Sequence, residues 1–156
     1  MTTVKTDPQP AATSTRENPH IGVLLIRARR ALVATTVERF AAEGFGDLRD
    51  AHDPVFAFLP PGGARLTELA RRAWMTKQSM GELLDELEAL GYVERTQDPT
   101  DRRAKMVTFT ERGRRANEIG IQAIRETERK WAGLVGTDRV RALRETLERV
   151  TRTGQT

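Results

Sequence analysis

Two short helical patterns separated by a tight break constrain this fold more than any other feature of the sequence. The first covers residues 68–73 behind the expected capping residue Thr67, and the second covers residues 77–90 behind Thr76. Gly91 is placed to end the second helix in a left-handed conformation. The apolar residues of the second pattern recur at helical spacing: Met80, Leu83, Leu84, Leu87 and Leu90. This arrangement predicts a helix-turn-helix.

A strand–turn–strand pattern follows at once. Residues 92–97 and 104–110 carry β-branched and aromatic residues, and residues 98–101 (Asp-Pro-Thr-Asp) favour a turn. Arg102 and Arg103 are expected at the tip of this hairpin. A hairpin behind a helix-turn-helix predicts a winged helix-turn-helix.

Long helical patterns flank this central part. One begins at Pro19 and stops before Gly44, a second covers residues 111–134, and a third is capped by Thr137. The two longest patterns each carry more than one apolar row, although a surface helix needs only one. The extra rows must therefore meet another element or another subunit. A further helical pattern covers residues 48–59, but Pro54 leaves its start open.

Composition limits the class of protein. A chain of 156 residues can bury a core without disulfides or metals, and we expect one folded unit, mainly α-helical with a small β-hairpin wing. The absence of Cys excludes disulfide frameworks and thiolate chemistry and fits a reducing compartment. No apolar run approaches a membrane span, and residues 1–18 are too polar to order themselves. We therefore expect a disordered tail on a cytoplasmic protein that does not bind membranes.

The start of the second helix of the pair is the candidate reader of double-stranded DNA. Such a helix enters the major groove with its N-terminus first, so Lys77, Gln78 and Ser79 are expected to contact DNA, with Thr76 on a phosphate. Four acidic residues occupy the later turns and favour this end-on entry: Glu82, Asp85, Glu86 and Glu88. The alternative is that these polar residues are solvated positions of an amphipathic helix.

The basic hairpin extends this candidate interface. An arginine on a narrow hairpin can enter a minor groove, and Asp101 in the turn is expected to orient one arginine by a charge-assisted hydrogen bond. Ordinary turn chemistry alone would also explain Asp98, Pro99 and Asp101. The expected DNA-binding residues are Arg65, Thr76, Lys77, Gln78, Ser79, Arg95, Asp101, Arg102, Arg103 and Lys105.

Residues 66–115, LTELARRAWMTKQSMGELLDELEALGYVERTQDPTDRRAKMVTFTERGRR, resemble the MarR family of transcriptional regulators. The most specific marks are DPTDRR in the hairpin and T-x-x-G at Thr110–Gly113. The resemblance implies a homodimer with intertwined terminal helices, in which Asp101 orients Arg103. It implies a domain over residues 19–156, with a DNA-binding lobe at 47–110 and dimerisation helices at 19–44 and 111–152. Trp74 departs from the family, which usually has a small residue there.

The resemblance also implies a function. Members of the family usually bind a pseudo-palindromic operator, commonly as repressors, and lose affinity when a small aromatic or anionic ligand enters beside the dimer helices. The residues expected at such a ligand site are His20, Arg27, His52 and Phe56. For His52 the alternative is a packed, hydrogen-bonded side chain. The branch of the family that senses peroxide through Cys is excluded.

A DNA-binding regulator has two rival interpretations, an enzyme and a module that binds only proteins. An enzyme is disfavoured because two His and no Cys offer no nucleophile with a base and no metal-ligand spacing, and residues 60–63 lack the pattern of a phosphate loop. No cofactor or metal is expected. A winged-helix module that binds only proteins remains the alternative, but it would have no need of the basic hairpin.

Overall fold

The computed structural model describes residues 19–153, so the tail expected at residues 1–18 lies outside the described residues. The helices are α1 (Ile21–Ala42), the one-turn 3-10 helix η1 (Asp50–His52), α2 (Asp53–Phe58), α3 (Leu66–Arg72), α4 (Lys77–Ala89), α5 (Glu111–Val135) and α6 (Thr137–Thr153). The strands are β1 (Ala64–Arg65), β2 (Val93–Asp98) and β3 (Asp101–Phe109).

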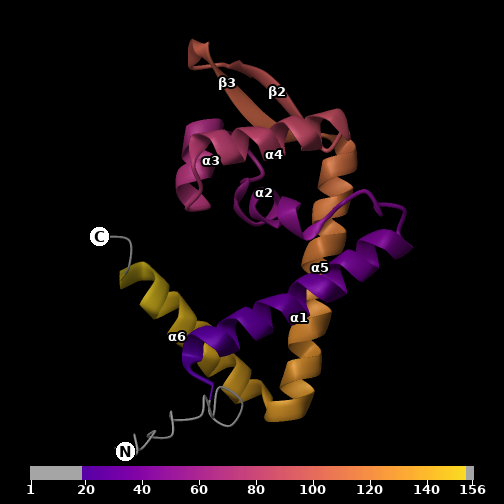
Figure 1. The fold of residues 1–156 in the computed structure, drawn as a ribbon, viewed down its shortest axis with the longest axis vertical. Coiled ribbons are helices and arrows are strands. Elements are labelled where there is room, and N and C mark those ends of the chain that lie inside the picture. Colours follow the sequence, from indigo (N-terminus) through magenta and orange to yellow (C-terminus); the bar gives the residue numbers. More distant parts are fainter. Residues whose placement is uncertain (1–18, 154–156) are drawn as a thin grey trace, which may run out of the picture.

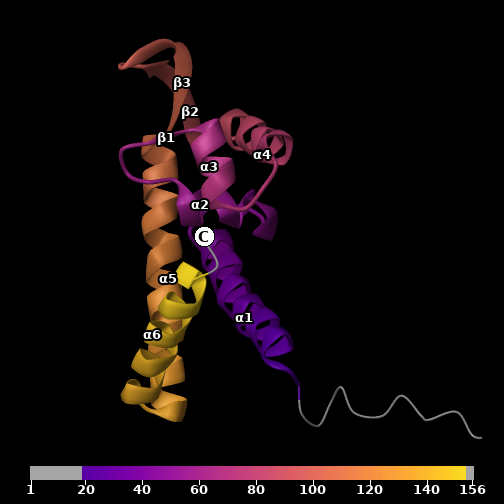
Figure 2. The ribbon, with the colours of Figure 1, turned by 90° about the vertical axis from the view of Figure 1, so that its left-hand side faces the viewer.

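A winged lobe stands at one end of the molecule and long helices form the other (Figure 1). The β2–β3 hairpin, which we call the wing, projects beyond α4, and α3 and α2 lie below it. The two long helices α1 and α5 pack against each other, and α6 lies beside the lower part of α5 (Figure 2). The predicted fold class, mainly α-helical with a winged helix-turn-helix, is confirmed.

The sheet has three strands in the order β1-β3-β2, and β1 was not predicted. Ala64 pairs with Val107 and Arg65 pairs with Met106 in an antiparallel ladder. Because β1 runs directly into α3, the extended residue Arg65 occupies the N-cap of that helix. The prediction that Thr67 caps α3 is therefore wrong, since it lies inside the first turn.

The ends of α1, α2 and α4 follow from local sequence. Gly44 and Gly91 adopt positive φ values of 85° and 78° just beyond α1 and α4, as expected for helix-ending glycines. The Thr76 hydroxyl accepts a hydrogen bond of 3.0 Å from the Ser79 amide, so this cap is confirmed. Pro54 lies in the first turn of α2, where a missing N–H costs nothing.

Trp74 occupies the left-handed position that ends α3. Its φ is 50°, the one positive value for a non-glycine residue in the described part of the chain. The Met75 amide donates to Ala70 O and the Trp74 amide to Arg71 O, which is the pattern of a Schellman helix end. A left-handed conformation costs about 1–2 kcal/mol for a residue with a Cβ. This accounts for a small residue being usual at this place.

The first turn of α5 touches the segment that follows α4. The Thr110 hydroxyl donates to Gly91 O at 2.6 Å and accepts from the Gly113 amide at 3.0 Å, which caps the helix. A Cβ on Gly113 would lie 1.9 Å from Tyr92 O, so only glycine fits this position. The T-x-x-G motif therefore fixes α5 against the end of the helix-turn-helix.

Substitution of Gly113 by alanine tests this close approach. We expect Gly113→Ala to lower the free energy of unfolding by about 3 kcal/mol, because the backbone must move to admit the methyl group. Gly133→Ala is the matched control, since a Cβ there meets nothing within 4 Å. It should raise stability by about 0.5–1 kcal/mol through helix propensity. Urea unfolding at one protein concentration measures both, and equal stability of the two variants would contradict the explanation.

Candidate nucleic-acid interface

The N-terminus of α4 is polar, exposed and free of acidic residues in its first turn. Lys77 and Gln78 are exposed, and the Lys77 ammonium has no ion pair with any residue of the described chain. Gln78 Nε2 donates to Glu82 at 3.1 Å, which holds the side chain along the helix. The helix end therefore presents backbone amides, one cation and one amide side chain, a set suited to phosphates and base edges.

Three of the four acidic residues on the later turns of α4 are paired within the fold. Asp85 and Glu88 both bind Arg95, at 2.7 Å from Asp85. Glu86 accepts from Arg49 at 2.6 Å and from His52 at 2.9 Å. These carboxylates hold β2 and η1 against α4, which is a structural reason for the acidic later turns.

Arg95 is not available as a DNA contact, because it is the partner of two of these carboxylates. Its side chain is 19% exposed and its guanidinium faces two carboxylates of α4. A cation that is already neutralised by two partners has little left to offer a phosphate. Sequence spacing could not find this, because the pairing depends on β2 folding back over α4.

The base of the wing turn is held by Arg65. Its guanidinium lies 2.7 Å from Asp98 Oδ2 and 3.7 Å from Asp101 Oδ2. Asp98 is buried and also accepts two hydrogen bonds of 2.7 Å from the amide and hydroxyl of Thr100. The Thr100 hydrogen bonds, followed by Arg65, lower the pKa of Asp98 to about 2. Arg65 therefore positions the wing, and Asp98 shapes its turn.

The basic residues of the wing are exposed at the beginning of β3. Arg102 and Arg103 follow the two-residue turn at Pro99 and Thr100, and Lys105 lies two residues further on. Their charged groups have no ion pair or hydrogen bond with the described residues. Asp101 accepts a hydrogen bond of 3.0 Å from the backbone amide of Arg103. The predicted orienting contact thus fixes the backbone of Arg103 rather than its guanidinium.

A cluster that the sequence analysis missed joins this lobe to α5. Tyr92 is fully buried and donates its hydroxyl to Asp47, while Arg112 binds Asp47 at 2.8 Å and stacks 4.6 Å from the centre of the Tyr92 ring. Burial, followed by the Asp47 carboxylate, raises the pKa of Tyr92 to about 12, so the phenol remains a donor at neutral pH. We call Asp47, Tyr92 and Arg112 the junction cluster.

A cavity of about 680 Å³ lies between the long helices and the winged lobe. We call it the interlobe cavity. Val33, Thr36, Val37 and Phe40 of α1 form one wall, and Asn117, Gly120, Ile121 and Ile124 of α5 form another. The rest comes from the segment around α2 and from α3: Leu48, Arg49, Asp50, His52, Asp53, Phe56, Ala57, Phe58, Leu59, Pro60, Pro61 and Arg72.

Two of the four expected ligand-site residues line this cavity. Phe56 and His52 do so, but His52 is 1% exposed and both of its ring nitrogens are hydrogen-bonded. Nδ1 accepts from the Arg49 amide at 3.2 Å, so Nε2 carries the proton that it donates to Glu86. His52 is therefore a packed, hydrogen-bonded side chain, as in the alternative interpretation of the sequence.

His20 and Arg27 do not line the interlobe cavity. Both are exposed, His20 at the N-cap of α1 and Arg27 in its first half, whereas the cavity wall begins at Val33. Six residues of helix separate Arg27 from Val33, a rise of about 9 Å. Within one chain, the expected set of four residues is therefore not brought together.

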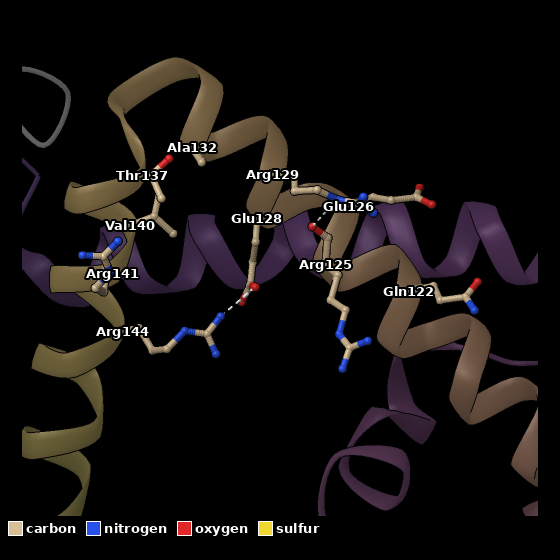
Figure 3. Close-up of a pocket in the computed structure, with 10 residues that line it drawn as sticks. All are labelled: Gln122, Arg125, Glu126, Glu128, Arg129, Ala132, Thr137, Val140, Arg141 and Arg144. Carbon is tan, nitrogen blue, oxygen red and sulfur yellow. Dashed lines mark hydrogen bonds and ion pairs between the residues drawn. The ribbon is translucent and has the colours of Figure 1, made fainter.

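A second hollow of about 700 Å³ runs between α5 and α6 (Figure 3). Its lining is charged, and Arg144 of α6 reaches across to Glu128 of α5 at 2.7 Å. Arg125 also lines it, and its guanidinium has no partner among residues 19–153. We call this the α5–α6 groove; it lies among the long helices, away from the wing.

Among residues 19–153, no three His, Cys, Asp or Glu side chains are grouped so that they could hold a metal ion. No helix in that range is long and apolar enough to cross a membrane.

An acid-free helix end beside a cationic wing defines a winged helix-turn-helix of the DNA-binding class. A family model described as the MarR family matches residues 58–104. No curated protein sequence matches the chain. The family match covers the helix-turn-helix and the start of the wing, so the predicted resemblance to the MarR family is confirmed. These similarities are to transcriptional regulators, in agreement with the prediction that the chain is not an enzyme.

Solved structures similar to this chain include transcriptional regulators. CouR bound to a 23-mer DNA duplex is 26% identical with a TM-score of 0.67, over 84% of this chain and 92% of the other. CouR from Rhodococcus jostii RHA1 bound to p-coumaroyl-CoA is 26% identical with a TM-score of 0.67, over 85% and 92%. A MarR-family regulator from Rhodococcus sp. RHA1 is 25% identical with a TM-score of 0.68, over 88% and 96%.

The low pKa of Asp98 predicts how acid affects the wing. A carboxyl with a lowered pKa in the folded state stabilises the fold fully above its ordinary pKa of 3.8, and this contribution is lost as the pH falls through about 2. Asp98→Asn should therefore lower the thermal midpoint at pH 5, and the gap to the wild type should close towards pH 2. Asp138→Asn is the control, because Asp138 pairs with Arg141 on the exposed surface of α6. A gap for Asp98→Asn that does not change with pH would contradict this role.

Proposed function

We propose that this protein is a sequence-specific DNA-binding repressor that acts as a homodimer on a pseudo-palindromic operator and is released by a small ligand. The observation that carries the DNA-binding part is the placement of unpaired cations. Lys77 at the start of α4 and Arg102, Arg103 and Lys105 on the wing stand at one end of the molecule (Figure 1), while neighbouring charges are paired internally. Within the winged lobe, the free positive charge is thus confined to the start of α4 and the wing, where a winged helix-turn-helix meets DNA.

Each part of the interface has a distinct role in this proposal. The N-terminus of α4 enters the major groove, with Gln78 and Ser79 near base edges and Thr76 and Lys77 near phosphates. The wing places Arg103 in the adjacent minor groove. Arg65 and Asp101 hold the wing in position and contact DNA only indirectly.

A second copy of the chain is proposed to cover the apolar surface of the long helices. Large apolar side chains are exposed at the start of α1, at the end of α5 and along α6: Ile21, Leu24, Leu25, Ile26, Leu134, Val135, Leu143 and Val150. Ile21 is 74% exposed and Leu134 is 82% exposed. An apolar surface of this extent is typical of an interface. A twofold dimer would also supply the paired helix ends that a palindromic site requires.

Ligand control is proposed to act through the interlobe cavity. The cavity is bounded by α1 and α5 on one side and by α2 and α3 on the other, so an occupant would change how the winged lobe sits on the long helices. That CouR has been solved with a DNA duplex and, separately, with p-coumaroyl-CoA supports a protein that responds to both. A winged-helix module that binds only proteins is less favoured, because it would not explain the exposed, unpaired cations of the wing.

Selection of bound duplexes from a random pool, at a stated salt concentration, tests the proposed function as a whole. We expect enrichment of a symmetric site bound by a dimer. Binding of no duplex by a folded protein would refute the proposal and favour the protein-interaction alternative.

Arg103→Ala should weaken operator binding by about 5- to 100-fold without affecting dimerisation, because it removes one minor-groove cation. Fluorescence anisotropy with the selected duplex measures the affinity, and sedimentation measures the dimer. Arg152→Ala is the matched control, since it removes the same charge from an exposed ion pair on α6. Equal affinities of the two variants would refute the wing contact.

Gln78→Ala should change base preference more than total affinity, because an amide side chain reads base edges. Lys77→Ala should weaken binding to all sequences alike and reduce the salt dependence. Repeating the duplex selection with each variant distinguishes these effects. A uniform loss of binding for Gln78→Ala would instead make Gln78 a phosphate contact.

A further inference from the structure

We infer that the ligand of the interlobe cavity is an uncharged aromatic molecule with a hydrogen-bonding group, held by Asn117. This inference rests on the proposed function, in which the cavity is the regulatory site. It narrows the aromatic or anionic ligand expected from the sequence to the uncharged class.

The charged residues that line the cavity balance one another. They are two arginines, Arg49 and Arg72, and two aspartates, Asp50 and Asp53, so their formal charges cancel. His52 adds no charge, because Nδ1 accepts a hydrogen bond and the ring is neutral. The cavity therefore offers no net attraction to an ion of either sign.

Each of these charges also has its own partner inside the chain. Arg49 binds Glu86 at 2.6 Å, and Arg72 binds Glu68 at 2.8 Å. Asp50 and Asp53 both bind Arg29, at 3.2 and 3.1 Å. An anionic ligand would have to compete with a carboxylate for either arginine, and a cationic ligand would have to compete with Arg29.

The arginine partners are held firmly. Hydrogen bonds from Arg71, followed by Arg72, lower the pKa of Glu68 to about 2. Hydrogen bonds from His52, followed by Arg49, lower the pKa of Glu86. Both carboxylates are therefore ionised at neutral pH and remain available to their arginines.

Asn117 is the polar lining residue that is left available. It lies on α5, partly buried, and its side-chain amide has no hydrogen bond with any described residue. Of the other uncharged polar side chains of the lining, Thr36 already donates to Leu32 O at 3.0 Å, and His52 is hydrogen-bonded through both ring nitrogens. A free amide offers one acceptor and two donors, which match an amide, phenol or carbonyl on a neutral ligand.

The rest of the lining is apolar and partly aromatic. Phe40 and Phe56 lie 6.0 Å apart at their ring centres, and Phe58 lies further out against Trp74. Ile121 and Ile124 add exposed aliphatic surface from α5. Flat aromatic ligands pack well against such walls.

The test compares two probes of the same shape, 2-naphthamide and 2-naphthoate, by calorimetry on the wild-type dimer without DNA. We expect 2-naphthamide to bind about tenfold more tightly or better, because the carboxylate is desolvated without a free cation. Equal or tighter binding of 2-naphthoate, or no binding of either probe, would overturn the inference.

Glu68→Gln should change the preference of the cavity between the charged and the uncharged probe. It leaves Arg72 without its carboxylate at the cavity wall, so 2-naphthoate binding should strengthen about tenfold while 2-naphthamide binding stays unchanged. Glu111→Gln is the matched control, since Glu111 also pairs with an arginine of its own helix, Arg114, but away from the cavity. If Glu68→Gln gives no gain beyond the control, charge pairing does not set the ligand class.

Asn117→Leu tests whether Asn117 holds the bound probe. It should weaken 2-naphthamide binding about fivefold or more by removing one hydrogen-bonding group. Gln122→Leu makes a similar change on the same helix but in the α5–α6 groove, and should have no effect. An unchanged affinity for Asn117→Leu, or a loss for Gln122→Leu, would overturn the assignment. The probe titrations need no DNA, so a failure of operator binding is a separate result that refutes the proposed function alone.

Discussion

The contact between the first turn of α5 and the backbone at Tyr92 fixes the relation between the two halves of this molecule. Thr110 caps α5 and at the same time bonds Gly91 O, and Gly113 allows the helix to approach Tyr92 O. The junction cluster adds an ion pair and a stacked guanidinium to the same place. A change in the long helices can therefore reach the end of α4 through one rigid contact.

Charge pairing determines which parts of a heavily charged surface remain free to bind. The carboxylates of α4 hold Arg95 and Arg49, and Arg65 holds the wing turn, so these cations act in folding rather than in recognition. The same pairing neutralises the interlobe cavity. Within the winged lobe, the cations left without partners lie at the start of α4 and on the wing. The same internal ion pairs therefore determine both the proposed DNA site and the proposed ligand site.

Local signals in the sequence predicted the elements well, because their causes lie within a few residues. Thr76 caps α4 through Ser79, Gly91 ends it, and Asp98 folds the wing turn through Thr100. The resemblance to the MarR family supplied the functional interpretation of these elements as parts of a dimeric DNA-binding regulator. The strand β1 was missed because two residues cannot show an alternating pattern, and its partners in β3 are more than forty residues away.

The sequence by itself determined the order of elements, the helix-turn-helix, the basic hairpin and the excess of apolar surface on the long helices. Only the tertiary structure decided which charges are free, because Arg95, Arg65 and His52 meet their partners across elements that are distant in sequence. It also decided that the cavity wall begins at Val33 and includes Asn117 but not His20 or Arg27. Periodicity gives the face of a helix, whereas the packing of one helix on another selects the stretch of that face that borders a cavity.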